Sequence, residues 1–409
     1  MISVITELRI AGRNLIRNRN RTAVAVLTVV GGLLAYLLAG GFIEWIFENM
    51  RESTIRSQLG HIQIVRPGYF EKGIADPYNF LLPSNSDELN NISKNPDVVT
   101  VAQRVAFSGL VSIGDTTVNF IGEGIDPARE AVISDQIHIR DGRNLERSEE
   151  RSALLGEGLA KNLAAKPGDK IVVLVTAANG TPNAIEVTVA GTFFTSAKEF
   201  DDTALRLPIQ LTQKLMRISG STSWVVLLKD TDQTSRVVSK LRSMLLADSF
   251  EVVPWIDLAD FYKKTVALFG TQVSLMKVII ALIIVLTISN TQTMNVLERT
   301  TEIGSMMAIG SRRSDILRMF ILEGFLIGII GGIAGVVLGY GIAAILSKTG
   351  IPMPPAPGME TGFTAQILVT PWLSINAIEL ANVTTLIASV MPAWKASRMN
   401  VVDALRCNQ

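Results

Sequence analysis

Residues 298–310 read ERTTEIGSMMAIG, a short mixed-charge segment between two long apolar runs. The run before it, 278–296, has no charged residue, and the run after it, 319–346, has one, Glu323. A helix needs roughly 20 apolar residues to cross a bilayer, and each run is close to or above that length. The sequence therefore predicts two membrane helices, with residues 298–310 at one membrane face between them.

An apolar stripe predicts that this segment is itself a helix. Its members recur at i, i+3, i+4 and i+7: Ile303, Met306, Met307 and Gly310. Gly310 can end the helix, and Ser311 can cap the next one. The alternative is a solvated membrane loop, but loops rarely carry such a periodic stripe. We expect a docking helix whose Met-rich face sits in a groove on another protein.

The segment also resembles the cytoplasmic coupling helix of the MacB, FtsX and lipoprotein-release permeases, the type VII ABC transporters. The resemblance rests on Glu298, Arg299, Glu302, Ile303, Gly304, Ala308, Ile309 and Gly310. In that family the helix docks on an ATP-binding subunit. The resemblance therefore implies ATPase coupling by Glu298, Arg299, Glu302, Ile303, Gly304, Met306, Met307, Ala308 and Gly310.

Composition predicts a mixed chain. Of its 409 residues, 48% are hydrophobic, which suits several membrane helices plus one sizeable soluble domain. A net charge of +1 gives no indication of nucleic-acid binding. The single cysteine, Cys407, excludes a disulfide within the chain, and two histidines make a histidine-based metal site improbable, so we expect no metal site.

The expected fold class is membrane α-helical, with four transmembrane helices and a large α+β extracytoplasmic domain inserted between helices 1 and 2. The expected parts are a cytoplasmic amphipathic helix (1–21), a first membrane helix extending into a stalk (22–47), the periplasmic domain (48–265), a second membrane helix (271–296), the coupling helix (297–315), a third membrane helix (316–346), a proline-rich periplasmic loop (347–371), a fourth membrane helix (372–394) and a cytoplasmic tail (395–409). We expect the basic start to be this amphipathic helix rather than a signal peptide, because the apolar run after it is too long and lacks a convincing cleavage site. The proline-rich loop is either a semi-rigid spacer or a partner-binding segment.

Alternation and turn residues place the elements of the α+β domain. Expected strands are 61–65, 98–105, 110–121 with a turn at 114–115, 170–176, 185–194 and 223–228, and expected helices are 207–215, 234–246 and 255–268. Residues 152–163 are expected to form a strand, a turn and a short helix. Three pieces resemble the family's external domain: 122–127, 155–160, and 189–193 followed by 199–202. The last piece, with 207–215 after it, is most similar to the lipoprotein-release permeases. The end of the chain, 391–406, resembles the family's C-terminal signature.

Small residues predict close helix packing in the third membrane helix. Spacings of four recur among Gly324, Gly328, Gly331, Gly332, Gly335 and Gly339.

The distribution of positive charge predicts the topology. Arginines and lysines gather before helix 1, between helices 2 and 3, and after helix 4, whereas the loop between helices 3 and 4 carries only Lys348. The positive-inside rule then places both termini and the coupling helix in the cytoplasm. The resemblance implies the bacterial inner membrane.

No sequence pattern indicates chemistry in this chain. It has no G-x-x-x-x-G-K-[ST] motif, no Ser/His/Asp constellation, no metal-ligand cluster and no paired carboxylates at catalytic spacing, so we expect a permease rather than an enzyme, with no cofactor of its own. The resemblance implies two ABC-type ATP-binding subunits that bind ATP and Mg, a second permease (a copy or a paralogue) and contact with membrane lipids. A periplasmic adaptor or acceptor protein is a further candidate partner.

Three functions remain open. The first is extraction or export of a lipophilic substrate, a lipoprotein or lipid, by mechanotransmission to the periplasmic domain. The resemblance to lipoprotein-release permeases implies an apolar cleft formed by Leu38, Phe42, Ile46, Ile279 and Ile283. The second is MacB-like, adaptor-dependent efflux of small amphiphiles or peptides. The third is FtsX-like transmembrane signalling without transport.

Overall fold

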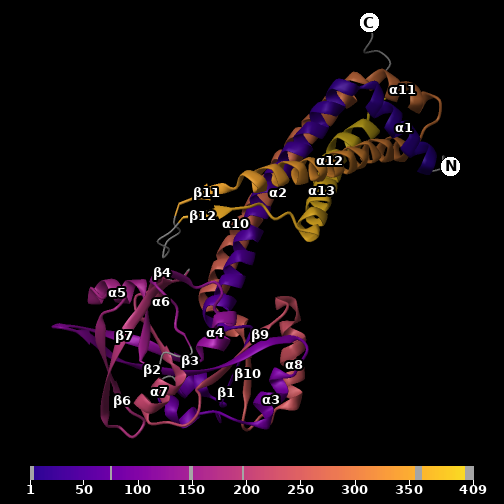
Figure 1. Cartoon of the computed structure of the whole chain (residues 1–409). Coiled ribbons are helices and arrows are strands. Elements are labelled where there is room, and N and C mark those ends of the chain that lie inside the picture. The colour runs from indigo at the N-terminus through magenta and orange to yellow at the C-terminus, as the bar shows by residue number, and fades with distance from the viewer. Residues whose placement is uncertain (1–3, 74–75, 147–150, 196–197, 355–361, 401–409) are drawn as a thin grey trace. The chain divides into compact units, whose positions relative to one another are not determined.

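The computed structural model describes residues 4–73, 76–146, 151–195, 198–354 and 362–400. It divides into two compact units, which are described separately. The membrane unit comprises residues 1–48, 265–352 and 364–409, and the β-rich unit comprises residues 49–264 and 353–363. Figure 1 labels the elements of both units.

The membrane unit is built from long helices. They are α1 (Val4–Arg17), α2 (Arg19–Thr54), α10 (Asp260–Glu298), α11 (Thr300–Ala308), α12 (Arg313–Thr349) and α13 (Pro371–Ser397), and both α2 and α10 continue into the β-rich unit. Among the described residues, α2, α10, α12 and α13 are long and apolar enough to cross a membrane. The β-rich unit lies between the first and second of these helices along the chain, as the sequence predicts.

The helices extend beyond the apolar runs from which they were predicted. Helix α2 begins at Arg19, with only Asn18 between it and α1, and it continues beyond residue 47 to Thr54, as expected for a helix that extends into a stalk. The loop expected at 347–371 contains two paired strands, β11 (Ile351–Met353) and β12 (Phe363–Ala365). Residues 355–361 of that loop and 401–409 of the tail lie outside the described residues.

Glycines let α12 pack closely against two helices of the membrane unit. On one side, a Cβ at Gly324 or Gly328 would meet Ser389 or Thr385 of α13 at 1.8 and 2.4 Å. Gly332 also lies on this side, near Ala381. On the other side, Gly331, Gly335 and Gly339 lie against Val29, Leu33 and Leu37 of α2, with Cβ distances of 2.7 to 3.0 Å. Without a side chain at these positions, the backbones can approach closely, as is common where membrane helices associate.

Among its described residues, the β-rich unit contains ten strands in one connected sheet. They are β1 (Ile62–Val65), β2 (Val98–Ile113), β3 (Thr116–Ile125), β4 (His138–Gly142), β5 (Ser152–Gly156), β6 (Lys170–Thr176), β7 (Pro182–Phe194), β8 (Ala204–Pro208), β9 (Ser223–Leu228) and β10 (Glu251–Pro254). Strands β2, β3, β8, β5, β7 and β6 pair in that order, and β6 pairs back to β2, so these strands close into a barrel. The first half of β2 instead pairs with β9, in the open sheet β10-β1-β9-β2.

Helices cover both parts of the β-rich unit. They are α3 (Asp87–Ser93), α4 (Pro127–Ile133), α5 (Glu157–Leu163), α6 (Lys198–Asp201), α7 (Ile209–Met216), α8 (Thr234–Met244) and α9 (Trp255–Leu258), with short π or 3-10 turns η1 (Ile55–Leu59), η2 (Tyr69–Gly73), η3 (Pro77–Phe80) and η4 (Thr231–Gln233). The barrel has its own core, which includes Phe107, Phe120, Ile171, Val187 and Leu205. The open sheet packs a second core against α3 and α8, including Trp224, Leu89 and Leu241.

Three local predictions in the β-rich unit are wrong. Residues 98–113 form one strand rather than two, because the chain runs without a turn through Gly109, whose missing side chain lets Leu174 of β6 approach. Leu207 belongs to β8, and the helix after it begins at Ile209. The helix expected over 255–268 is interrupted at Ala259, whose φ of −88° and ψ of 62° are not helical.

Candidate coupling site at the junction of α10, α11 and α12

Helix α11 is a separate short helix between two membrane helices. Arg299, with φ of −97° and ψ of 15°, separates it from α10. Gly310 follows its end with φ of +108°, in a region that favours glycine. The start of α12 is capped by Asp315, whose Oδ2 accepts the Arg312 amide at 3.0 Å. Arg312, rather than the expected Ser311, is therefore the N-cap residue of α12.

The apolar stripe of α11 packs within the membrane unit. Ile303 is fully buried, in a cluster with Val296, Ile316, Phe320 and Ala393. Met306 and Met307 are half-buried against the same cluster. Ile303 therefore contacts this chain rather than another protein, whereas Met306 and Met307 keep part of their surface exposed. Helical periodicity correctly marks one apolar face, but the cover for that face is supplied by α10, α12 and α13 of the same chain.

The opposite face of α11 is exposed. It carries Glu302, Ser305 and Ala308, and it continues into Ile309, whose side chain is 88% exposed. Ala308, Ile309 and Gly310 are all exposed, so an apolar surface continues over three residues at the end of α11. Of the residues expected to couple to an ATPase, Glu298, Glu302, Ala308 and Gly310 are exposed, whereas Arg299, Ile303 and Gly304 are buried.

A buried ion pair fixes the start of α11 to α12. Nη1 of Arg299 lies 3.0 Å from Oε1 of Glu323, and the two side chains are only 8% and 2% exposed. The same Glu323 oxygen accepts a hydrogen bond of 2.8 Å from Nδ2 of Asn14 in α1. The Arg299 guanidinium also lies over the Phe320 ring, 5.7 Å from its centroid. Three helices thus meet at one carboxylate, and each charged group has a partner, as buried charges require.

Helix α1 is tied to α11 and to the end of α10 by further polar contacts. Nη2 of Arg17 donates to both carboxylate oxygens of Glu302, at 2.6 and 2.8 Å. Arg21, at the start of α2, forms an ion pair with Glu298. Burial disfavours ionisation of Glu302, but the hydrogen bonds and charges of Arg299 and Arg17 outweigh it, so the pKa of Glu302 lies below its ordinary value.

The contribution of α1 was not predicted from the sequence. Its arginines indicate a basic helix at the membrane face, and that pattern does not show which carboxylates they meet. Asn14 and Glu323 are 309 positions apart, so only the tertiary fold brings them together. The contacts with α1 and with α12 hold α11 from two sides.

The residues expected to line a substrate cleft are divided between two helices of the membrane unit. Ile279 and Ile283 of α10 are 50% and 53% exposed, whereas Leu38, Phe42 and Ile46 of α2 are half-buried. The exposed face of α10 also includes Leu275, Val278, Leu282 and Leu286, each at least 57% exposed. This face is uniformly apolar and suits lipid tails or another apolar helix.

Comparison with known proteins identifies two family regions. The model of the MacB-like periplasmic core domain matches residues 22–244, more than half of the chain. The model of the FtsX-like permease C-terminal region matches residues 274–401. The second region includes the whole coupling site except α1 and the start of α2.

Several curated proteins are similar in sequence. The macrolide export ATP-binding/permease protein MacB of Hyphomonas neptunium is 32% identical over 212 residues, which cover 50% of this chain and 30% of that protein. MacB of Rhodospirillum rubrum is 28% identical over 422 residues, covering 97% of this chain and 60% of that protein. The lipoprotein-releasing system transmembrane protein LolC of Xylella fastidiosa is 29% identical over 275 residues, covering 63% of this chain and 65% of that protein. The chain thus matches 30 to 65% of the length of these relatives.

Among solved structures, the periplasmic region of MacB from Actinobacillus actinomycetemcomitans is 17% identical with a TM-score of 0.37, covering 53% of this chain and 96% of that one.

Proposed function

Because the chain belongs to the family of ABC transporter permeases that have a MacB-like periplasmic core domain and an FtsX-like C-terminal region, we propose that it couples an ATP-binding partner to movement of its β-rich unit. In this proposal the partner binds the exposed face of α11. ATP binding and hydrolysis then shift α11, and α2 and α10 carry the shift along their length into the β-rich unit. This is a nucleotide-biased two-state change acting at a distance.

The observation that carries the proposal is the two-sided construction of α11. Its inner face is anchored by the buried Arg299–Glu323 pair, while Ile309 next to it is 88% exposed. A docking element must present a surface to its partner and also be rigidly attached to the parts that it moves. Helix α11 meets both requirements.

The proposed orientation places α1 and α11 in the cytoplasm and the β-rich unit in the periplasm. The support is the gathering of positive charge before α2, between α10 and α12, and after α13. The ATP-binding partner then meets α11 on the side where ATP is available.

For the substrate, we propose a lipophilic envelope molecule, a lipoprotein or a lipid. The exposed apolar face of α10 supports this class, because acyl chains can lie along it without desolvating a polar group. The similarity to LolC, named as a lipoprotein-releasing protein, supports the same class. Efflux of small amphiphiles is the second candidate, supported by the match to a macrolide export protein over 97% of this chain. Signalling without transport is the remaining alternative.

The docking surface is tested by Ile309→Asp in the full-length chain, purified with a tag from its native membrane. We expect the variant to lose a co-purifying P-loop subunit, identified by mass spectrometry, while its thermal stability stays unchanged. Leu246→Asp is the matched control, because Leu246 is also exposed, at 72%, but lies in the β-rich unit. Retention of the P-loop subunit by Ile309→Asp would contradict the proposed docking site.

The substrate is tested by native mass spectrometry of the nucleotide-free complex. A bound lipoprotein or phospholipid supports the lipophilic class. A bound small amphiphile, released only when a periplasmic adaptor is added, would favour the second candidate. A complex that hydrolyses ATP but binds neither would favour signalling.

A further inference from the structure

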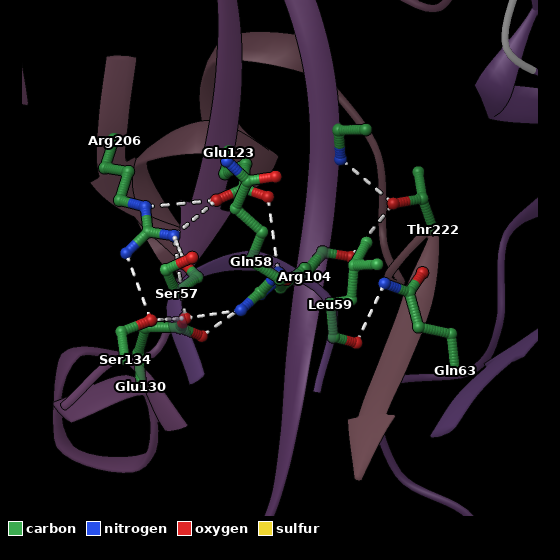
Figure 2. A network of polar contacts seen from close by, with 11 residues as sticks. Ser57, Gln58, Leu59, Gln63, Arg104, Glu123, Glu130, Ser134, Arg206 and Thr222 are labelled. Atoms are coloured by element: carbon green, nitrogen blue, oxygen red, sulfur yellow. Dashed lines mark hydrogen bonds and ion pairs between the residues drawn. The ribbon is translucent and has the colours of Figure 1, made fainter. Parts of the chain in front are cut away.

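The first long helix ends inside the β-rich unit in an unusual way. Helix α2 reaches Thr54 and continues as the π-helical turn η1, which ends at Gly60 with φ of +65°. The last carbonyls of a helix have no partner within the helix and are commonly hydrated. Here three successive carbonyls, of Ser57, Gln58 and Leu59, accept hydrogen bonds from Arg206, Arg104 and Gln63 (Figure 2).

The two arginines that hold this helix end are buried. Arg104 and Arg206 are 5% and 2% exposed. Arg104 binds Glu130 in a bidentate manner, with Nη2–Oε1 and Nε–Oε2 distances of 2.5 and 3.1 Å. Arg206 contacts Oε2 of Glu123 through Nε and Nη2, at 3.0 and 2.9 Å, and donates from Nη1 to Oγ of Ser134 at 3.2 Å. Two positive and two negative groups thus balance in the network that Figure 2 shows.

This network lies where the barrel meets the open sheet. Arg104 is the residue at which β2 passes from β9 to β3, since it is paired with Ser223 on one side and Ile125 on the other. Arg206 lies on β8, directly opposite Glu123 of β3. The end of η1 is therefore attached to three strands of the central framework rather than to a surface loop.

The second long helix enters the β-rich unit by a different connection. Ala259 separates α9 from α10, because its backbone conformation is not helical. The side chains around this break are mainly apolar: Trp255 and Ala259 are buried with Ile55, and the Tyr262 ring packs edge-on against Trp255 with centroids 5.1 Å apart. Apolar contacts of this kind are not directional and tolerate sliding, unlike bidentate ion pairs.

A network of three buried charges and the half-buried Glu123 needs a reason beyond stability. Well-packed apolar groups of similar volume commonly stabilise a protein as well as a buried ion network does. What the network adds is a fixed geometry, because each guanidinium bonds both a carboxylate and a helix carbonyl. That property is useful where one element must transmit movement to another.

We propose that Arg104 and Arg206, with Glu123 and Glu130, form a rigid joint that fixes the end of α2 and η1 to the strand framework, while the break at Ala259 lets the start of α10 turn. This inference rests on the proposed function, in which these helices move the β-rich unit. In consequence α2 acts as the lever, and the β-rich unit follows its tilt as one body. Arg104 and Arg206 are positioning residues in this scheme.

The test uses spin labels on the full-length chain in its complex with the ATP-binding partner. The distance between labels at exposed positions 49 and 115 tests whether the joint is rigid. The distance between labels at 264 and 115 measures movement about the break at Ala259. Cys407→Ser removes the native thiol. In the wild-type sequence we expect a narrow 49–115 distance distribution with or without nucleotide, and a broader 264–115 distribution. A 49–115 distance distribution as broad as the 264–115 distribution would contradict the proposed rigid joint.

The paired substitution Arg104→Met with Glu130→Leu removes one ion pair without leaving a buried charge alone. We expect the 49–115 distribution to broaden about twofold, and ATP hydrolysis to continue while substrate release falls about tenfold, because motion no longer reaches the strands. Arg104→Lys is a milder second variant, since lysine keeps the charge but loses the bidentate fork. Arg236→Met is the control, because Arg236 pairs with Asp97 at the surface.

The inference would be overturned if the 49–115 distance distribution and substrate release were both unchanged in the Arg104→Met/Glu130→Leu variant and in Arg104→Lys. Failure of the proposed function gives a different result: the wild-type chain would then show no ATP-binding partner and no nucleotide-dependent release. The width of the 49–115 distribution does not depend on transport, so the joint is tested in either case.

Discussion

Arg299 and Glu323 form a buried ion pair, with 3.0 Å between Nη1 and Oε1. Arg299 immediately precedes α11, and Glu323 lies in α12, so this one contact ties the proposed docking helix to a membrane helix. Asn14 of α1 shares the Glu323 oxygen. A shift of α11 would therefore act first on this pair, and through it on α12 and α1.

Removing one partner of this pair should be worse than removing both. Arg299→Met leaves Glu323 buried without its cation, and Glu323→Gln leaves Arg299 without its anion. We expect each single variant to lose about 3 kcal/mol of stability, and the double variant to lose clearly less. Thermal unfolding of the detergent-solubilised chain measures this. Arg318→Met, at an exposed position on α12, should leave the stability unchanged. A double variant whose loss equals the sum of the two single losses would contradict the buried-pair interpretation.

The Arg17–Glu302 pair should matter for coupling more than for stability. Both side chains are about half exposed, at 53% and 47%, so breaking the pair should cost less than about 1 kcal/mol. If α1 holds α11 in position, Arg17→Glu should still lower the ATPase activity of the complex at low salt. Arg17→Gln should lower it less, because the neutral amide removes the ion pair without bringing two carboxylates together. Glu302→Arg is not a suitable rescue, because Glu302 also pairs with the buried Arg299 at 3.0 Å. Wild-type ATPase activity in Arg17→Glu would show that the contact has no role in coupling.

The sequence predicts the larger architecture well, because its signals are local. Apolar runs mark the four long helices, and the spacing of glycines in α12 marks its packing faces, where Gly328 meets Thr385 and Gly335 meets Leu33. The resemblance of residues 298–310 to a coupling helix correctly indicates the permease family.

What the sequence does not predict depends on contacts between distant segments. The stripe at Ile303 is visible in the sequence, but its cover comes from Phe320 and Ala393. The barrel closes only because β2 continues through Gly109 to reach β6. The buried arginines at 104 and 206 look like ordinary strand residues, since their carboxylate partners lie on other elements.

The glycines of α12 offer a test of helix packing within one helix. A Cβ at Gly328 would lie 2.4 Å from Oγ1 of Thr385 and 3.0 Å from Oδ1 of Asn382, whereas a Cβ at Gly341 would have no neighbour within 4 Å. Gly328→Val should therefore destabilise the chain by about 2 kcal/mol or more through overpacking. Gly341→Ala should be neutral or slightly stabilising, because alanine favours the helix. Equal melting temperatures for the two variants would contradict close packing of α12 on α13.

The two histidines offer a matched pair for a pH experiment. His61 is buried, with Nδ1 accepting the Leu228 amide at 3.1 Å, so its Nε2 carries the proton and donates to Oγ1 of Thr231 at 2.8 Å. Thr231 in turn donates to Oε1 of Glu52 at 2.7 Å. Burial lowers the pKa of His61 to about 4, because it disfavours the charged imidazolium. Protonation of Nδ1 would also break the bond to Leu228.

The sign of the effect follows from this lowered pKa. Between the ordinary value of 6.5 and about 4, the unfolded chain binds a proton at His61 and the folded chain does not, so stability falls as the pH falls through this window. Hydrogen exchange at the Leu228 amide should therefore accelerate from pH 6.5 to 4, after correction for the intrinsic rate. His61→Gln should remove most of this pH dependence and expose the amide at every pH. His138→Gln should keep the wild-type profile, because His138 is exposed and lies against Phe194. A wild-type profile in His61→Gln would assign the pH dependence to another group.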